Sequence, residues 1–134
     1  MLSRLVLAVA LVACSNEKKH DPAASPPSAA TLATMADDEI VDAALKSMAQ
    51  IARLAKQYAT DCEALAKALA DHAAKNKDVI TAFKKISADE AKQRDIATRH
   101  GGRIVAIGQE TVRALQAKCA DHPSVRALFD TLNK

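Results

Sequence analysis

The sequence predicts an all-α protein, an antiparallel helical bundle that occupies residues 37–134. Alanine, leucine, lysine, glutamate, glutamine and arginine dominate this stretch, and all of them favour helices. The stretch contains neither the apolar–polar alternation of strands nor an Asn-Gly or Asp-Gly hairpin turn. Only 2% of the chain is aromatic, so the helices are expected to pack closely through alanine. A domain of about 98 residues is large enough for one apolar core.

Three main helices and a short C-terminal helix are expected, because apolar residues recur at three- and four-residue spacing in four stretches. The first stretch begins at residue 37, where three acidic residues place negative charge in the first turn of a helix. The last begins at Pro123, because proline suits the first turn of a helix. The four apolar stripes are Val41, Leu45, Met48, Ala52, Ala55 and Tyr58; Cys62, Leu65, Leu69, Ala73, Val79 or Ile80, Phe83 and Ile86; Ala91, Ala97, Ile104, Ile107, Val112, Leu115 and Cys119; and Val125, Leu128, Phe129 and Leu132.

Two capping boxes mark the starts of the second and third helices. In such a box, a Ser or Thr side chain and a Glu three residues later satisfy free N–H groups at a helix start. Residues 60–63 (Thr-Asp-Cys-Glu) open the second helix, and residues 87–90 (Ser-Ala-Asp-Glu) open the third. Gly101 and Gly102 lie inside the third helix, and each costs about 1 kcal/mol relative to alanine. A kink or short break is therefore expected there.

Residues 14–36 are expected to form a disordered tether in front of the bundle. They contain Pro22, Pro26 and Pro27 among repeated serine and alanine, with almost no large apolar residue. Such a composition cannot bury enough surface to offset the entropy of ordering the chain. A flexible coil of this length spans roughly 26 Å.

The first 13 residues have the order of a secretory signal peptide. Arg4 precedes an apolar run from Leu5 to Val12, and the small residue Ala13 follows. The run is far shorter than the roughly 20 residues that a membrane-spanning helix needs. It is therefore expected to be removed rather than to span a bilayer permanently.

Residues Leu11-Val12-Ala13-Cys14 resemble the lipobox of bacterial lipoproteins. The resemblance implies that a diacylglycerol group is attached to the thiol of Cys14 and that the lipoprotein signal peptidase cleaves before it. Ser15, rather than aspartate, follows the cysteine, which implies delivery to the outer membrane instead of retention at the inner one. Lipid anchoring of this kind is stable because more than one acyl chain is attached.

The charge balance argues against a nucleic-acid partner. Removing residues 1–13 takes away one arginine and no acid from the 19 basic and 16 acidic residues of the chain. A domain so close to neutral lacks the basic surface that binds phosphates. The expected partners are therefore the membrane, through Cys14, and a protein of the cell envelope.

Cys62 and Cys119 are expected to form a disulfide. With Cys14 lipidated, they are the two remaining thiols of the chain's three, in an oxidising compartment. Cys62 opens the second helix and Cys119 closes the third, and antiparallel neighbours place those two ends level. Both cysteines also lie on apolar stripes. The alternative is a reactive redox pair, but the C-x-x-C spacing is absent.

The four histidines are expected to be surface or half-buried residues rather than metal ligands. If the disulfide sets the register of the second and third helices, His72 faces residue 109 and lies about 14 Å from His100. Covalent haem is excluded because C-x-x-C-H is absent, and Met48 on a core stripe is expected to be packing rather than a haem ligand. No metal or cofactor is therefore expected. The four are His20, His72, His100 and His122.

No catalytic motif occurs in the chain, which contains no G-x-S-x-G, H-E-x-x-H or P-loop pattern. Residues 61–65 (Asp-Cys-Glu-Ala-Leu) and 118–125 resemble, loosely, small exported helical lipoproteins of unassigned role. The expected function is that of a non-enzymatic binding or structural module displayed from a membrane. The alternative is a carrier that binds haem, a metal or a lipid between its helices.

Overall fold

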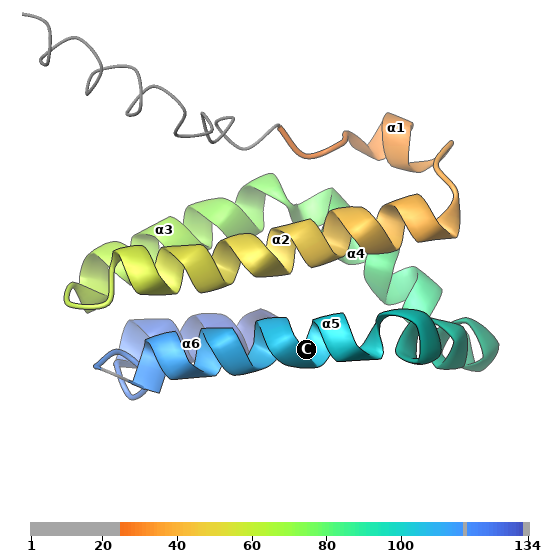
Figure 1. Cartoon of the computed structure of the whole chain (residues 1–134). Helices are drawn as coiled ribbons and strands as arrows, with labels where there is room; N and C mark the ends of the chain where they lie inside the picture. The colour runs from red at the N-terminus through yellow and green to blue at the C-terminus, as the bar shows by residue number, and fades with distance from the viewer. Residues whose placement is uncertain (1–24, 117, 133–134) are drawn as a thin grey trace, which may run out of the picture.

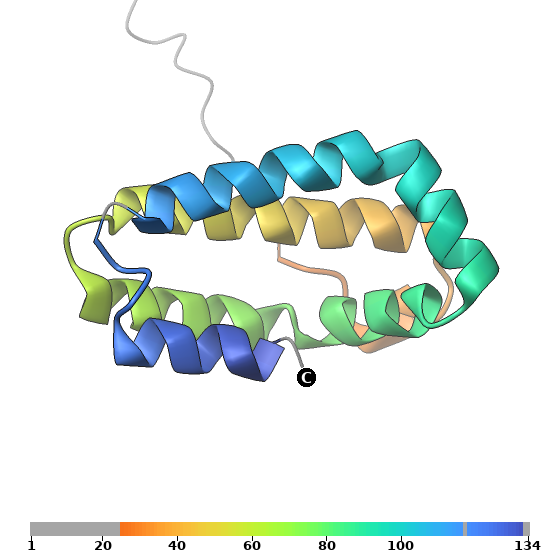
Figure 2. The same ribbon diagram turned by 90° about the horizontal axis from the view of Figure 1, so that it is seen from below.

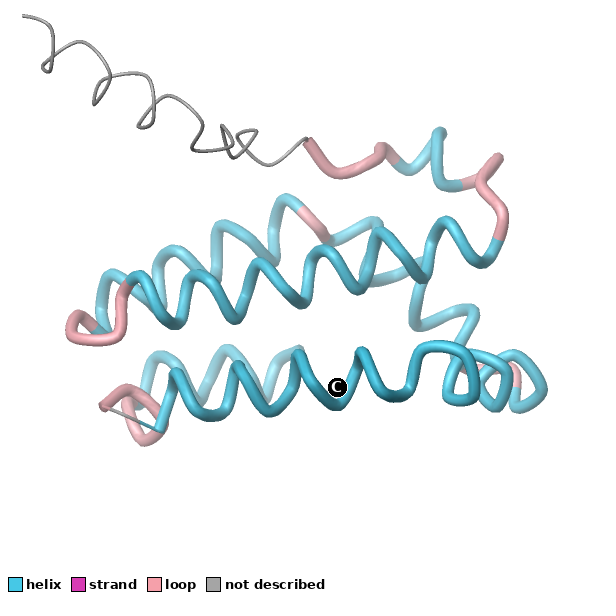
Figure 3. Tube along the Cα trace, viewed as in Figure 1, coloured by secondary structure: helices cyan, strands magenta, loops and turns pink. Residues whose placement is uncertain are grey.

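The structure of the chain is a computed structural model that describes residues 25–116 and 118–132. All regular structure in these two ranges is helical, as Figure 3 shows. A disulfide joins Cys62 to Cys119, whose Cα atoms are 5.3 Å apart. The predicted disulfide-stapled, all-α bundle is therefore confirmed. Its helices are α1 (Ala29–Leu32), α2 (Asp37–Gln57), α3 (Cys62–Lys75), α4 (Lys77–Ser87), α5 (Glu90–Gln116) and α6 (Pro123–Leu132) (Figure 1).

The main helices alternate in direction along the chain. α2 turns back into α3 and α4, which lie end to end; α5 then returns beside α2, and α6 lies beside α3 (Figures 1 and 2). α5 runs parallel to α2 and packs chiefly along it. The predicted register, with His72 facing residue 109, was wrong: beyond the disulfide, α3 packs mainly against α2 and α6.

An ionic ladder joins α2 to α5 and reflects their parallel register. The guanidinium of Arg99 donates hydrogen bonds to Asp38 and holds the pKa of that carboxyl below its ordinary value. Such exposed pairs contribute little singly, but the pairs of Arg99 and Arg103 share a sequence separation of 61 residues, as two parallel helices in a fixed register would give. The three rungs are Lys92–Asp37 at 2.8 Å, Arg99–Asp38 at 2.7 Å and Arg103–Asp42 at 2.8 Å.

Aspartates, rather than the predicted Thr60 and Ser87, cap α3 and α5. The carboxylate of Asp61 accepts the N–H of Ala64 at 3.0 Å. Asp89 accepts two first-turn N–H groups of α5, at 2.9 and 3.0 Å. In both capping boxes the aspartate lies directly before the first helical residue, and a carboxylate also interacts favourably with the helix N-terminus.

The predicted second helix is divided in two at Asn76. The backbone N–H and the side-chain amide of Asn76 both donate to the carbonyl of His72, at 3.0 and 2.9 Å. Asn76 has φ −100° and ψ 11°, outside the helical region, and α4 begins at the next residue. Asparagine favours such local bonds between side chain and backbone over an uninterrupted helix.

The folded domain begins before residue 37, where the predicted tether ends and the predicted bundle starts. Residues 29–32 form α1, which contacts α4, and the side chain of Leu32 is buried in the core. Met35 packs against the same core. The prediction of a tether through residue 36 was therefore wrong from residue 29 onward, because Leu32 and Met35 dock this segment on the core.

The core consists of two apolar clusters, one at each end of the bundle, rather than the single core expected. Between them lie three buried polar residues, Ser47, His72 and Asn76, which we call the polar layer. The first cluster joins α1, α2, α4 and α5, and the second joins α2, α3, α6 and the end of α5. Their buried members are Leu32, Ile40, Val41, Ala44, Leu45, Val79, Ile86 and Ile96, and then Ala55, Leu65, Leu69, Leu115, Cys119 and Val125.

α5 is continuous through Gly101 and Gly102, and its ribbon changes direction in its first half (Figure 2). The stripe predicted for this helix was only partly correct. Ile104, Ile107 and Leu115 face the bundle, whereas the side chain of Val112 is 51% exposed. The predicted stripe included Val112 because alanine and valine occur on both sides of this helix, so their spacing does not identify the inward side.

Candidate interaction surface

Of the two expected groups of site residues, the structure describes the cysteine pair but not the lipobox. Residues 11–14, which carry the lipobox resemblance, lie outside the described residues, and so does His20. Cys62 and Cys119 are joined, at the start of α3 and in the segment between α5 and α6. Cys119 is almost fully buried in the second cluster, so the bridge is part of the core.

The polar layer is held together by its own hydrogen bonds. Ser47 Oγ of α2 lies 2.9 Å from Nε2 of His72 on α3, and Asn76 Nδ2 lies 3.3 Å from Nδ1 of the same ring. The three residues are only 5%, 8% and 7% exposed. Each of these polar side chains therefore has a partner inside the bundle, as buried polar groups require.

The order Ser–His–Asn resembles a nucleophile, a base and an orienting group, but the hydrogen bonds run in the wrong direction for catalysis. The Asn76 amide donates to Nδ1 of His72, so the ring proton resides on Nε2 and is donated to Ser47 Oγ. A general base would have to accept the serine proton at Nε2. The layer is therefore a structural link between α2 and α3.

The polar layer makes stability depend on pH. Burial lowers the pKa of His72 below its ordinary value, and the charge of Lys75 acts in the same direction, while a hydrogen bond to the backbone of Ser47 opposes them. The unfolded chain thus binds a proton near pH 6.5, whereas the folded chain binds it only at lower pH. The layer's contribution is complete above about pH 6.5 and is lost as the pH falls toward the folded pKa.

We expect the free energy of unfolding to fall by about 1.4 kcal/mol per pH unit in this window, through His72 alone. His72→Gln should remove this dependence, because glutamine cannot gain the proton. Urea unfolding between pH 7.5 and 5.5 measures the effect, with His122→Gln as the control that keeps it. An equal slope in His72→Gln and the wild type would show that another group is responsible.

The remaining histidines lie apart from the polar layer. His100 is half-buried on α5 and helps to lower the pKa of Asp38 and Asp42 of α2. His122 Nε2 lies 3.5 Å from the carboxylate of Glu63, near the disulfide. The expectation that all four are surface or half-buried residues was wrong for His72, which is buried. Within residues 25–116 and 118–132, no group of three His, Cys, Asp or Glu side chains could hold a metal ion.

The exposed large apolar side chains of the described residues are Val105 and Val112, both on α5. They are 57% and 51% exposed, and their spacing of seven places them on one side of the helix. Gly101 and Gly108 complete the same row, at positions 101, 105, 108 and 112. We call this row the outer stripe of α5. Figure 2 shows α5 along one long edge of the bundle, with no described helix beyond it.

The fold itself does not require the glycines of α5. Apart from the adjoining residues of the chain and the helix's own backbone, no atom lies within 4 Å of the position that a Cβ would take on Gly101, Gly102 or Gly108. None of them has a positive φ. Each glycine inside a helix costs about 1 kcal/mol relative to alanine, so the outer stripe carries a cost that no contact within the described bundle explains.

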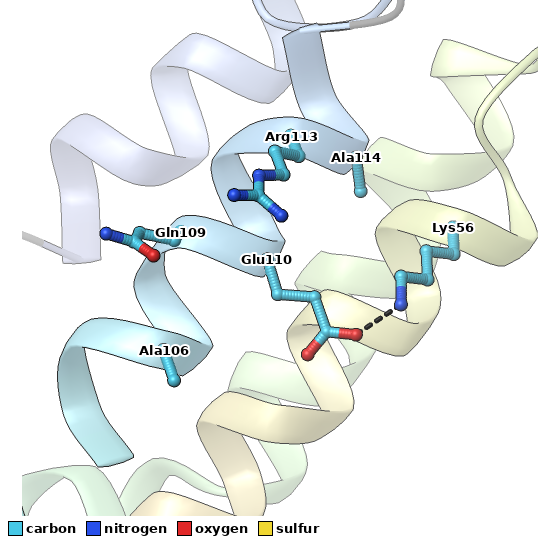
Figure 4. A pocket seen from close by; sticks show the side chains of 6 residues that line it. All are labelled: Lys56, Ala106, Gln109, Glu110, Arg113 and Ala114. Carbon is cyan, nitrogen blue, oxygen red and sulfur yellow. Dashed lines mark hydrogen bonds and ion pairs between the residues drawn. The ribbon is translucent and has the colours of Figure 1, made fainter. Parts of the chain in front are cut away.

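A groove adjoins the outer stripe on the side of α2. It is lined by Ala106, Gln109 and Arg113 of α5, and the ion pair of Lys56 with Glu110 lies at its edge (Figure 4). The hydrogen bond from Lys56 keeps the pKa of Glu110 below its ordinary value, so this carboxylate stays charged. Stripe and groove together form a surface with an apolar centre and a polar rim, the arrangement found at protein interfaces.

Comparison with known protein families, with curated proteins and with solved structures found no match for this chain. None of the described helices is both long enough and apolar enough to cross a bilayer. The candidate site therefore rests on the geometry of the bundle. Sequence reasoning missed Val105, although its spacing to Val112 and the nearby glycines were visible in the sequence.

Proposed function

We propose that this protein is a lipid-anchored envelope lipoprotein whose bundle is a non-enzymatic interaction module. The anchor rests on the lipobox resemblance at Cys14 and the signal-like segment before it. The observation that supports an interaction module is the pair of exposed valines on α5. Exposed apolar groups rimmed by polar residues are typical of surfaces that bind another protein.

The proposal places binding on the outside of the bundle rather than between its helices. The side chains of the polar layer bond to one another. Two hollows in the described residues lie at the surface, one beside the outer stripe and one lined by Asp38, Lys92 and Arg99 of the ionic ladder. A partner would therefore meet α5 without opening the core.

Changing Cys14→Ser tests the anchor. Serine has no thiol to receive the diacylglycerol group, so we expect the protein to leave the membrane fraction or to remain as an uncleaved precursor. Fractionation and intact mass measure both results, with Ser25→Ala, which leaves all three cysteines in place, as the control that retains the lipid. A Cys14→Ser protein with unchanged partitioning and mass would contradict the anchoring.

The interaction module is tested with a photoreactive amino acid at Thr98, an exposed position beside the outer stripe. Illumination of intact envelopes should yield covalent adducts of defined mass. The same probe at exposed Lys67 on α3 is the control, because it lies away from α5. Equal adduct patterns from the two positions, or none from either, would contradict a binding role for α5.

A further inference from the structure

We propose that the outer stripe of α5 binds a second copy of this chain, with the two α5 helices antiparallel. The proposal rests on the interaction module proposed above and names its partner. Its basis is the order of residues in the stripe, which places each valine opposite a glycine when the helix pairs with an antiparallel copy of itself. The exposed valines and the unexplained glycines then have one common cause.

The spacing of the stripe reads the same in both directions, four, three and four residues, while the residues alternate glycine, valine, glycine, valine. An antiparallel copy centred between residues 106 and 107 therefore places Val105 opposite Gly108 of the second copy. It also places Val112 opposite Gly101. Each valine is a knob that meets a hole left by a missing side chain.

A parallel pair would lose this fit. In register, it would place valine against valine and glycine against glycine, which separates the helices and leaves gaps beside the glycines. The open space around Gly101 and Gly108 is filled only by a partner whose valines arrive in the reverse order. The stripe therefore favours an antiparallel copy over a parallel one.

The charges beside the stripe permit this register. In this register Thr98 is level with residue 115 of the second copy and within one turn of its Arg113, so two like charges do not meet there. One heptad before Gly101, the row reaches Arg94, which bonds to Glu90 of its own helix. The apolar contact is thus limited to about 17 Å of helix. Such a contact is smaller than a standard interface, so we expect a weak dimer, with a Kd on the order of 10⁻⁵–10⁻⁴ M.

Lipid anchoring would strengthen a weak contact of this kind. Copies held at one membrane surface have a higher effective concentration than copies free in solution, without any new contact. The test is therefore made on the lipidated full chain, reconstituted in phosphatidylcholine vesicles that contain no other protein. The photoreactive amino acid at Thr98 serves as the probe, and the yield of covalent dimer is the readout.

When the outer stripe is unchanged, we expect a covalent dimer in which the probe at position 98 is linked to residues near Arg113 of the second copy. Gly108→Leu should lower the dimer yield at least tenfold, because leucine occupies the hole that receives Val105. The same variant should keep or raise its melting temperature, because leucine favours helix and the space is open. Ala70→Leu, at an exposed position of α3 away from the outer stripe, should leave the yield within twofold.

Three results would overturn the proposal: no dimer in vesicles, a yield unchanged by Gly108→Leu, or a link from Thr98 to Thr98 of the other copy, which marks a parallel pair. The probe in intact envelopes separates this proposal from the interaction module. Adducts to a different protein alone would overturn self-association and leave the module standing. Absence of any adduct in envelopes and in vesicles would overturn both.

Discussion

Removing the disulfide is expected to lower the free energy of unfolding by about 4 kcal/mol. The bridge closes a loop with a sequence separation of 57 residues, so the oxidised unfolded chain has far less conformational freedom than the reduced one. For a domain of this size, such a loss lowers the melting temperature by roughly 15–30 °C. The bridge also ties the start of α3 to the segment between α5 and α6, so α6 should loosen first.

Urea unfolding of Cys62→Ala with Cys119→Ala, compared with the oxidised wild type, measures this effect. The wild type in excess reductant is the matched control and should agree with the double variant. Intact mass should show that the oxidised chain is about 2 Da lighter than the reduced one, the mass of two hydrogens. A stability change below about 1 kcal/mol would mean that the bridge does not constrain the unfolded chain.

Leu45→Ala should be the most damaging of the single truncations in the first cluster, with a loss of about 3–5 kcal/mol. Leu45 is fully buried on α2, among residues of α1, α4 and α5. Its removal leaves a cavity where four helices meet, and α2 and α5 cannot move closer there without disturbing the ionic ladder. Val105→Ala is the matched control, because that valine is 57% exposed and should change stability by less than about 0.5 kcal/mol.

Tyr58 shows whether the two clusters unfold together. The chain has no tryptophan and one tyrosine, and Tyr58 packs in the second cluster, away from Leu45. In Leu45→Ala, tyrosine fluorescence and far-ultraviolet circular dichroism should therefore shift to the same lower urea concentration. A fluorescence transition that stayed at the wild-type midpoint would show that the ends of the bundle unfold separately across the polar layer.

The helices and the cysteine pair were predictable because their signals are local or periodic. The acidic residues in the first turn of α2, Pro123 as the first residue of α6 and the apolar spacing on α2 each act within one helix. The pairing of Cys62 with Cys119 combined two helix ends with an apolar face. The lipobox resemblance and the anchor at Cys14 remain predictions, because they lie outside the described residues.

The break at Asn76 and the burial of His72 were missed for one physical reason. Steps of three and four residues from Cys62 lead through Leu65 and Leu69 to positions 72 and 76, and then to Val79 and Ile86. Positions 72 and 76 therefore belong to the same buried row as these apolar residues. A polar residue at such a position was taken as a sign of the surface. Here the polar groups satisfy one another across helices, so burial costs little, and Ser47 on α2 completes them.

The candidate surface was missed because periodicity alone cannot tell an inward stripe from an outward one on a helix with apolar residues on both sides. Val112 was assigned to the core and Val105 to neither face. The parallel packing of α5 on α2 decides which side turns inward, and that packing depends on contacts between residues far apart in the sequence. Glycines without a structural role were the available signal for the outer face.

The docking of α1 has a mechanical consequence for a chain held at Cys14. Tension along the segment that precedes α1 would reach the core first at Leu32, whose side chain is the buried one of this four-residue helix. The load would peel α1 from α4 before it reached α2, and the covalent cross-link lies at the far end of the bundle, at the start of α3 (Figure 1). Under tension, α1 would thus detach first and lengthen the segment between Cys14 and the domain, while the part held by the disulfide stays folded.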